Sequence, residues 1–184
     1  RRGAFNKAVP IFEKALKEDK NLTAAHYNLA KTYVELKDFE KAEDGLRTTL
    51  EQDDKHYQAH YEIAFVLSKT GRIEEGLEHL VKAIKVNPYF VKAYITLARF
   101  YKTAGKGELI IKLFKRGLKL NPNAIPLWEE LYNLYFVKMD LKSAMKAAVE
   151  IAKRRGAYND YLRLGGIQLA VGDFENAEKS FKKS

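Results

Sequence analysis

The feature that most constrains this chain is a repeat of 34 residues. Four consecutive segments align with one another: residues 23–56, 57–90, 91–124 and 125–157, the fourth being one residue shorter. An incomplete copy occupies residues 158–184, and residues 1–22 match the second half of a further copy. A period of this length is typical of stacked helical units, because one such unit cannot bury its apolar face alone. We therefore expect a single repeat array over residues 1–184.

The copies agree in side-chain size at positions counted from the start of each segment. Position eight is mostly small: Ala30, Ala64, Ala98, Tyr132 and Gly165. Position twenty is also mostly small: Ala8, Ala42, Gly76, Ile110, Ala144 and Ala177. Position twenty-four reads Phe12, Leu46, Leu80, Phe114, Ala148 and Phe181. Small side chains allow two helix backbones to come close, and large ones fill the space between neighbouring hairpins.

Each copy contains two amphipathic runs joined by a short turn. In the first full copy, apolar residues recur every three or four positions over 24–36 and again over 39–50, which is the period of an α-helix. The turns read Lys37 and Asp38, Gly71 and Arg72, and Gly172 and Asp173. Glycine suits a left-handed helix end, and aspartate suits the cap of the next helix. The pattern therefore predicts an all-α chain of about 11 helices in antiparallel pairs.

This pattern resembles the tetratricopeptide repeat family over essentially the whole chain. The runs Lys-Asp-Phe-Glu-Lys-Ala at 37–42 and Gly-Asp-Phe-Glu-Asn-Ala at 172–177 match the turn of that family, and Pro88 and Pro122 stand at its terminal proline. The resemblance implies a right-handed superhelical solenoid.

The chain departs from the family pattern at four positions: Tyr132, Ile110, and Lys20 and Asp54 in place of the terminal proline. We therefore expect less regular packing around the third and fourth copies. Because neither end carries a clear polar capping helix, we also expect the chain to be part of a longer array.

The resemblance further implies that the first helix of each copy lines a concave groove. The residues at the groove positions are Tyr27, Asn28, Lys31, Tyr61, Phe65, Lys92, Ile95, Arg99 and Lys102. Aromatic rings beside cations suit a peptide with hydrophobic anchors and acidic groups, or a partner helix. The alternative is that some of these side chains pack against a neighbouring helix.

Two well-known ligand modes of the family are not favoured. One grips a terminal carboxylate with lysine at position five, which here is Tyr27, Tyr61, Ile95 and Glu129. The other uses an asparagine ladder at position six, which here is Asn28, Glu62, Thr96, Glu130 and Arg163. The partner is therefore left open.

Charge is unevenly distributed along the chain, whose formal net charge is +9. Residues 23–56 carry 5 basic and 8 acidic side chains, whereas residues 91–124 carry 8 basic and 1 acidic. Within the basic segment, one helix stripe holds Lys112, Lys115, Arg116 and Lys119. The stripe is either a solvated helix face or a docking surface for an anionic protein, nucleic acid or membrane surface. Nucleic acid is the less favoured partner, because base-reading repeats spread basic character over several copies.

A third alternative is self-association. The acidic residues 23–56 of one copy of the chain would meet the basic residues 91–124 of another, head to tail.

The sequence offers no arrangement typical of an enzyme or a metal site. It contains no cysteine, so disulfides and thiolate sites are excluded. Glu129 and Glu130 are adjacent on a predicted helix and point in different directions. His56 and His60 are four residues apart but lack a third ligand. We expect His60, like His26, to pack where the family places tryptophan.

The chain is therefore interpreted as a non-catalytic protein-interaction scaffold without a cofactor or a small-molecule substrate. No stretch of the sequence is apolar over the roughly 18 residues that a membrane span needs. The composition fits the cytoplasm and the periplasm equally.

Overall fold

The computed structural model describes residues 2–184 of the chain, and over these residues it contains eleven α-helices and no strand. The helices are α1 (Arg2–Glu18), α2 (Thr23–Leu36), α3 (Phe39–Gln52), α4 (Tyr57–Lys69), α5 (Ile73–Val86), α6 (Val91–Thr103), α7 (Glu108–Leu120), α8 (Ile125–Val137), α9 (Leu141–Arg154), α10 (Tyr158–Ala170) and α11 (Phe174–Phe181). The predicted all-α helical repeat is confirmed. The right-handed sense of the solenoid stays a prediction.

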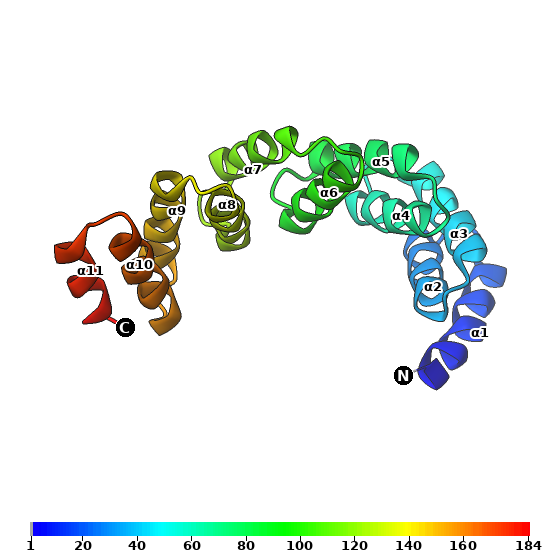
Figure 1. Cartoon of the computed structure of the whole chain (residues 1–184). Helices are drawn as coiled ribbons and strands as arrows, with labels where there is room; N and C mark the ends of the chain where they lie inside the picture. The colour runs from blue at the N-terminus through cyan, green and yellow to red at the C-terminus, as the bar shows by residue number, and fades with distance from the viewer. Residues whose placement is uncertain (1) are drawn as a thin grey trace. The chain divides into compact units, whose positions relative to one another are not determined.

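The helices alternate in the order that the sequence repeat indicates. The even-numbered helices from α2 to α10, here called first helices, begin at Thr23, Tyr57, Val91, Ile125 and Tyr158, where the aligned segments begin. The odd-numbered helices from α3 to α11 are the second helices. Within the pairs α2–α3, α4–α5, α8–α9 and α10–α11, the two helices pack against each other. These antiparallel pairs follow one another along the chain in Figure 1.

The chain forms two compact units, each with its own apolar core. Unit 1 is Arg1–Phe100 and unit 2 is Tyr101–Ser184, so the boundary lies within α6. The core of unit 1 is built from fully buried side chains of α2, α3 and α4, among them Leu46, Ile63 and Leu67. The core of unit 2 includes Ala148, Leu164 and Ile167. The division of the chain into repeats within one array stays a prediction.

The turn inside each hairpin uses one backbone conformation. Position fifteen has a positive φ in every copy: Lys37 (64°), Gly71 (83°), Gly105 (70°), Met139 (58°) and Gly172 (79°). This left-handed residue ends the first helix and reverses the chain.

Aspartates follow this turn in three of the copies. Asp38 caps α3 by accepting a hydrogen bond from the Lys41 backbone N–H at 3.3 Å. Asp140 caps α9 in the same way. Asp173 instead accepts hydrogen bonds from the side chain of Asn176, so the expected backbone cap is absent at α11.

Close helix contacts explain two unusual residues in unit 2. A Cβ atom at Gly165 would lie 2.6 Å from the ring of Phe181, so a larger residue there would displace that ring. In the fourth copy, Tyr132 replaces a small residue and packs against the cluster that contains Ala144 and Ala148. All five other copies place leucine or phenylalanine where Ala148 stands, so the large and small positions are exchanged in the fourth copy.

Candidate functional site

The predicted groove residues of unit 1 lie on three first helices. Tyr27, Asn28 and Lys31 are on α2, Tyr61 and Phe65 are on α4, and Lys92, Ile95 and Arg99 are on α6. We call this set the first-helix face. Adjacent members are joined by contacts, since α2 meets α4 and Thr96 of α6 bonds to Tyr61 of α4. Lys102 is exposed and belongs to unit 2, so it is described separately from this face.

The two tyrosines of this face already contact neighbouring side chains of the fold. The Tyr27 ring lies 4.6 Å from the His56 ring, and the Tyr61 ring meets the Phe90 ring edge to face at 5.1 Å. The Thr96 hydroxyl donates to the Tyr61 hydroxyl oxygen at 3.4 Å. Burial raises the pKa of Tyr27 to about 12, with smaller contributions from the charges of Glu62 and Tyr57. Both rings therefore belong to the inter-repeat packing as well as to the face.

The remaining members of the face are more open to solvent. The Phe65 side chain is 36% exposed, and the ammonium of Lys69 lies 5.1 Å from its ring centre. Lys31 is exposed and lies over the Tyr27 ring at 5.5 Å. Lys92 is also exposed. The face thus presents an apolar ring flanked by cations, the combination that the sequence predicts at these positions.

Glu62 lies beside Lys31 and Lys92 of this face, and it is not among the groove residues predicted from the sequence. It lies on α4, next to Tyr61 in the chain, and its side chain is half-buried. Burial raises the pKa of its carboxyl, while nearby Lys31 and Lys92 oppose that rise. Glu62 stands at position six, the groove position that Asn28 occupies in the first copy, and this position could have identified it from the sequence. The carboxyl is therefore a potential acceptor among the cations of the face.

Position four makes the same hydrogen bond in each of the four full repeats, whatever the side chain. His26 Nε2 bonds to the Lys20 carbonyl oxygen at 2.9 Å, and His60 Nε2 bonds to the Asp54 carbonyl oxygen at 3.1 Å. The Tyr94 hydroxyl and the Trp128 indole donate to the carbonyls of Pro88 and Pro122 at 3.0 and 2.9 Å. Because a carbonyl oxygen only accepts hydrogen bonds, the side-chain N–H or O–H is the donor in each case. We call this bond the carbonyl anchor.

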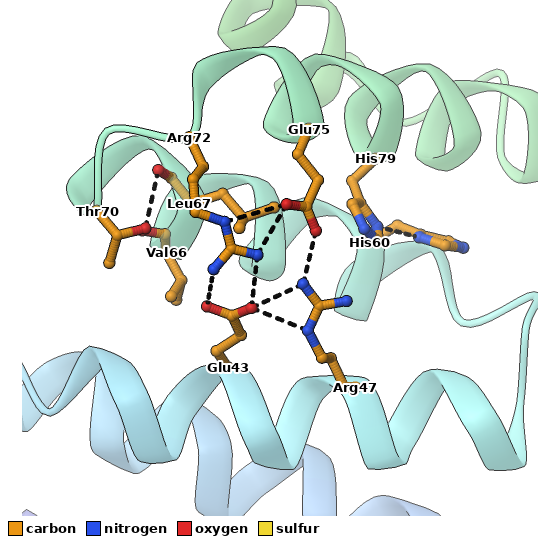
Figure 2. Close-up of polar contacts among 9 residues, drawn as sticks. All are labelled: Glu43, Arg47, His60, Val66, Leu67, Thr70, Arg72, Glu75 and His79. Atoms are coloured by element: carbon orange, nitrogen blue, oxygen red, sulfur yellow. Dashed lines mark hydrogen bonds and ion pairs between the residues drawn. The ribbon is translucent and has the colours of Figure 1, made fainter.

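His60 also faces His79 of α5, with their Nδ1 atoms 2.9 Å apart (Figure 2). Since Nε2 of His60 carries the proton of the carbonyl anchor, its neutral form has a bare Nδ1, and His79 Nδ1–H is the donor between the rings. The pKa of His79 is lowered to about 4, mainly by burial and also by the neighbouring His60, Lys82 and Arg47. The pair is therefore a neutral contact of the α4–α5 hairpin near neutral pH.

His56 takes a separate role from this pair. Its Nδ1 accepts the backbone N–H of Ala59 at 3.2 Å and caps the start of α4. Over residues 2–184, no group of three or more His, Cys, Asp or Glu side chains is arranged to hold a metal ion.

Four charged side chains link the hairpins of unit 1 in a closed network (Figure 2). Both Nη atoms of Arg72 donate to Glu43 at 2.9 Å, and Arg47 bridges Glu43 and Glu75. Burial raises the pKa of Glu43, but the hydrogen bonds from Arg72 and Arg47 outweigh it and hold that pKa below its usual range. Each member of the network is thus bonded to a partner of opposite charge, and its role is to fix α5 against α3.

The buried Asp160 performs a similar task in unit 2. It accepts two hydrogen bonds from Arg155 at 2.6 and 2.9 Å and one from the Ala157 backbone N–H at 3.1 Å. The Arg155 guanidinium, more than the opposing effect of burial, holds the pKa of this carboxyl below its usual range. Arg155 also bonds to Glu129, so the residue ties α8 to the start of α10. Glu129 is therefore engaged in structure.

The predicted basic stripe lies on α7. Lys112, Lys115, Arg116 and Lys119 are all exposed. The structure thus presents the stripe to solvent, and its partner is considered below. No helix over residues 2–184 combines the length and apolarity needed to cross a membrane.

Comparison with protein-family models identifies tetratricopeptide repeats over residues 1–61 and 57–90. A comparison with curated protein sequences found no significant match. Repeats of this family build protein-interaction scaffolds, and the chain falls in that class.

Solved structures of the same fold cover nearly the whole chain. The pilF protein of Pseudomonas aeruginosa is 20% identical over 97% of this chain and 82% of its own, with a TM-score of 0.72. A tetratricopeptide repeat protein from Parabacteroides merdae is 25% identical over 100% of this chain and 72% of its own, with a TM-score of 0.62. YrrB, described as having an unusual peptide-binding site, is 18% identical over 94% and 89%, with a TM-score of 0.61. The chain belongs to the tetratricopeptide repeat family.

Proposed function

We propose that the first-helix face of unit 1 binds a peptide or a helix of a partner protein, and that the chain acts without catalysis. The observation that carries the proposal is the half-open Phe65 ring of α4, whose centre lies 5.1 Å from the Lys69 ammonium, with exposed Lys31 and Lys92 on the flanking first helices α2 and α6. An apolar anchor beside cations is complementary to a segment with a large apolar side chain and acidic neighbours. The peptide-binding site in the description of YrrB is in keeping with this type of ligand.

The packing of the face decides which residues would contribute most to binding. Tyr61 is held by Phe90 and Thr96, so its removal would disturb the hairpins as well as the ligand. Phe65 and Lys92 are more exposed and can be changed with less effect on the fold. We therefore place the main apolar contact at Phe65 and the main charge contact at Lys92.

A random dodecapeptide library displayed on phage and selected on the immobilised chain tests this function. We expect selected peptides to carry an apolar side chain near Asp or Glu. The double variant Phe65→Ala, Lys92→Glu should weaken their binding by about tenfold or more, measured by fluorescence anisotropy.

The matched control is Val81→Ala, Lys85→Glu on α5, where Val81 is 49% exposed and Lys85 is exposed. It makes the same chemical changes outside the face and should leave binding within about twofold of the unmodified chain. Equal binding by both variants, or equal loss, would count against the first-helix face.

A further inference from the structure

Unit 2 contains a hollow that is lined by residues outside the groove positions of α8. Its volume is about 620 Å³, and α7, α8 and α9 enclose it. The α8 residues that line it include Trp128 and Tyr135, which stand at positions four and eleven. The family's groove uses other positions of the same helix. The hollow is therefore independent of the first-helix face of unit 1 and has a size typical of ligand sites, which span roughly 300–1,000 Å³.

The interior of the hollow is apolar and its rim is cationic. Leu118 and Trp128 contribute to its lining. Lys115 and Lys119 of α7 and Lys146 of α9 stand at its edge, and all three are exposed. Over residues 2–184 none of these three lysines forms an ion pair. The rim thus carries three positive charges that no carboxylate neutralises by direct contact.

The carboxylates near the rim already have bonding partners. Glu150, which also lines the hollow, pairs with Arg154 one turn along α9. Asp140 accepts the Ser143 backbone N–H at 3.1 Å and caps α9. Lys115 and Lys146 lie near enough to Asp140 to help lower its pKa, after the larger effect of its hydrogen bonds to Ser143. An anionic ligand at the rim of the hollow would therefore encounter more positive than negative charge.

The chemistry of the hollow selects among anionic partners. One face of the Trp128 ring is covered by the Arg154 guanidinium at 5.4 Å, which leaves less aromatic surface for stacking a nucleic-acid base. The single carboxylate of a fatty acid would engage only one part of a rim whose lysines lie on two helices. Several carboxylates around one apolar group would match both the rim and the interior. We propose that the hollow binds a segment of a partner protein in which large apolar side chains stand between acidic residues.

Trp128 is the only tryptophan of the chain, so its fluorescence reports directly on the hollow. The probe is the acetylated peptide Asp-Glu-Leu-Phe-Glu-Asp, titrated into the full 184-residue chain. We expect a saturable change in Trp128 emission. Replacing Leu and Phe of the peptide by Ser, or its acidic residues by Asn and Gln, should each weaken binding by about tenfold or more. No saturable response to the acidic peptide would overturn the proposal.

Two double variants separate the rim from the general charge of α7. Lys119→Glu, Lys146→Glu changes the rim and should weaken peptide binding by about tenfold or more. Lys112→Glu, Arg116→Glu changes the net charge equally on residues that do not line the hollow, and should alter binding by less than about threefold. Circular dichroism melting checks that both variants are folded, and peptide affinity measured below each melting temperature gives the comparison. Equal weakening by both would overturn a defined site in favour of a diffuse basic field.

Sodium dodecanoate and a single-stranded DNA oligonucleotide serve as competing ligands in the same titration. Neither should change Trp128 emission in a saturable manner at concentrations where the acidic peptide saturates. Tighter binding of dodecanoate than of the peptide would overturn the assignment in favour of a lipid. Tighter binding of the oligonucleotide would overturn it in favour of nucleic acid.

Discussion

Two residues adopt a backbone conformation that glycine occupies in the other repeats. Lys37 and Met139 have φ values of 64° and 58° at the position where the remaining copies have Gly71, Gly105 and Gly172. The left-handed conformation costs a residue with a side chain about 1–2 kcal/mol. Both side chains are exposed, so no packing contact offsets this cost. The two turns are therefore sites of stored strain.

Replacing either residue by glycine should stabilise the fold. For Lys37→Gly and Met139→Gly we expect the free energy of unfolding to rise by about 0.5–1 kcal/mol each, because relief of strain exceeds the added entropy of the unfolded chain. Urea denaturation measures the change. Lys37→Ala and Met139→Ala are the controls, since they remove the side chain and keep the strain. Alanine variants as stable as the glycine variants would show that the backbone is not the cause.

The contact between His60 and His79 should make stability depend on pH. The folded pKa of His79 is about 4, below its ordinary 6.5, and burial also lowers that of His60. Lys82, Arg47 and His56 disfavour added positive charge at the pair, whereas Glu75 and Asp54 favour it. The unfolded chain therefore binds more protons than the folded one between pH 6.5 and 4. The full stability is present above pH 6.5 and is lost as the pH falls toward 4.

The variant His79→Gln should remove a large part of this pH dependence. We expect the loss of unfolding free energy between pH 6.5 and 4 to shrink by an amount on the order of 2 kcal/mol relative to the unmodified chain. Urea denaturation at a series of pH values gives the comparison. Parallel pH curves for the two proteins would assign the dependence to carboxyl groups instead.

At the scale of helices, the α8–α9 hairpin exchanges its large and small side chains. Tyr132 fills space beside Ala144 and Ala148, whereas the other complete copies place alanine on the first helix and leucine or phenylalanine on the second. Tyr132 is further held by Phe136, whose ring lies 5.8 Å away, and by the Arg163 guanidinium at 5.2 Å. Tyr132 departs from the family pattern, and the small Ala148 on the facing helix compensates for its size.

This exchange predicts coupled effects of substitution. Tyr132→Ala should cost about 3 kcal/mol because it leaves a cavity, and Ala148→Leu alone should cost about 1–3 kcal/mol because it overfills the contact. The double variant restores the arrangement of the other copies and should be more stable than the sum of the two single effects. Thermal and urea unfolding measure all three. Strictly additive losses would mean that the two side chains do not share this space.

The sequence predicted the helices well because their signals are local. Apolar spacing predicts α2 and α3, and the alignment of the repeats places the starts of the first helices α2, α4, α6, α8 and α10. The features that it missed depend on partners far along the chain. His79 is 19 residues from His60, and no local sequence pattern predicts their contact. The left-handed turns at Lys37 and Met139 were also hidden, because the usual signal for that conformation is glycine.

At the scale of the whole molecule, positive charge is concentrated in unit 2. That unit has 16 Lys and Arg side chains against 9 Asp and Glu, which is +7 of the total of +9. The proposed peptide hollow and the basic stripe of α7 both lie within it. Unit 1 contains the first-helix face and is nearly neutral. The two proposed binding surfaces therefore sit in different electrostatic surroundings.

The turn between α6 and α7 should be the first site of limited proteolysis. Residues 104–107 separate the two helices, are all exposed and include two glycines. A short trypsin digestion should cut after Lys106 and yield fragments 1–106 and 107–184, identified by mass spectrometry. The variant Lys106→Gln should slow this first cut. Earlier cleavage at Arg72 or Lys138, which lie in other hairpin turns, would contradict the prediction.

The carbonyl anchor bears on how copies of this motif diverge. Its acceptor is a main-chain oxygen, which Lys20, Asp54, Pro88 and Pro122 supply equally well, and its donor is the N–H or O–H of histidine, tyrosine or tryptophan. Selection can therefore change the residue types at both ends of the bond while its geometry persists. A search for a histidine, tyrosine or tryptophan donor six residues after a carbonyl in the turn between repeats would find relatives that have lost the consensus residues.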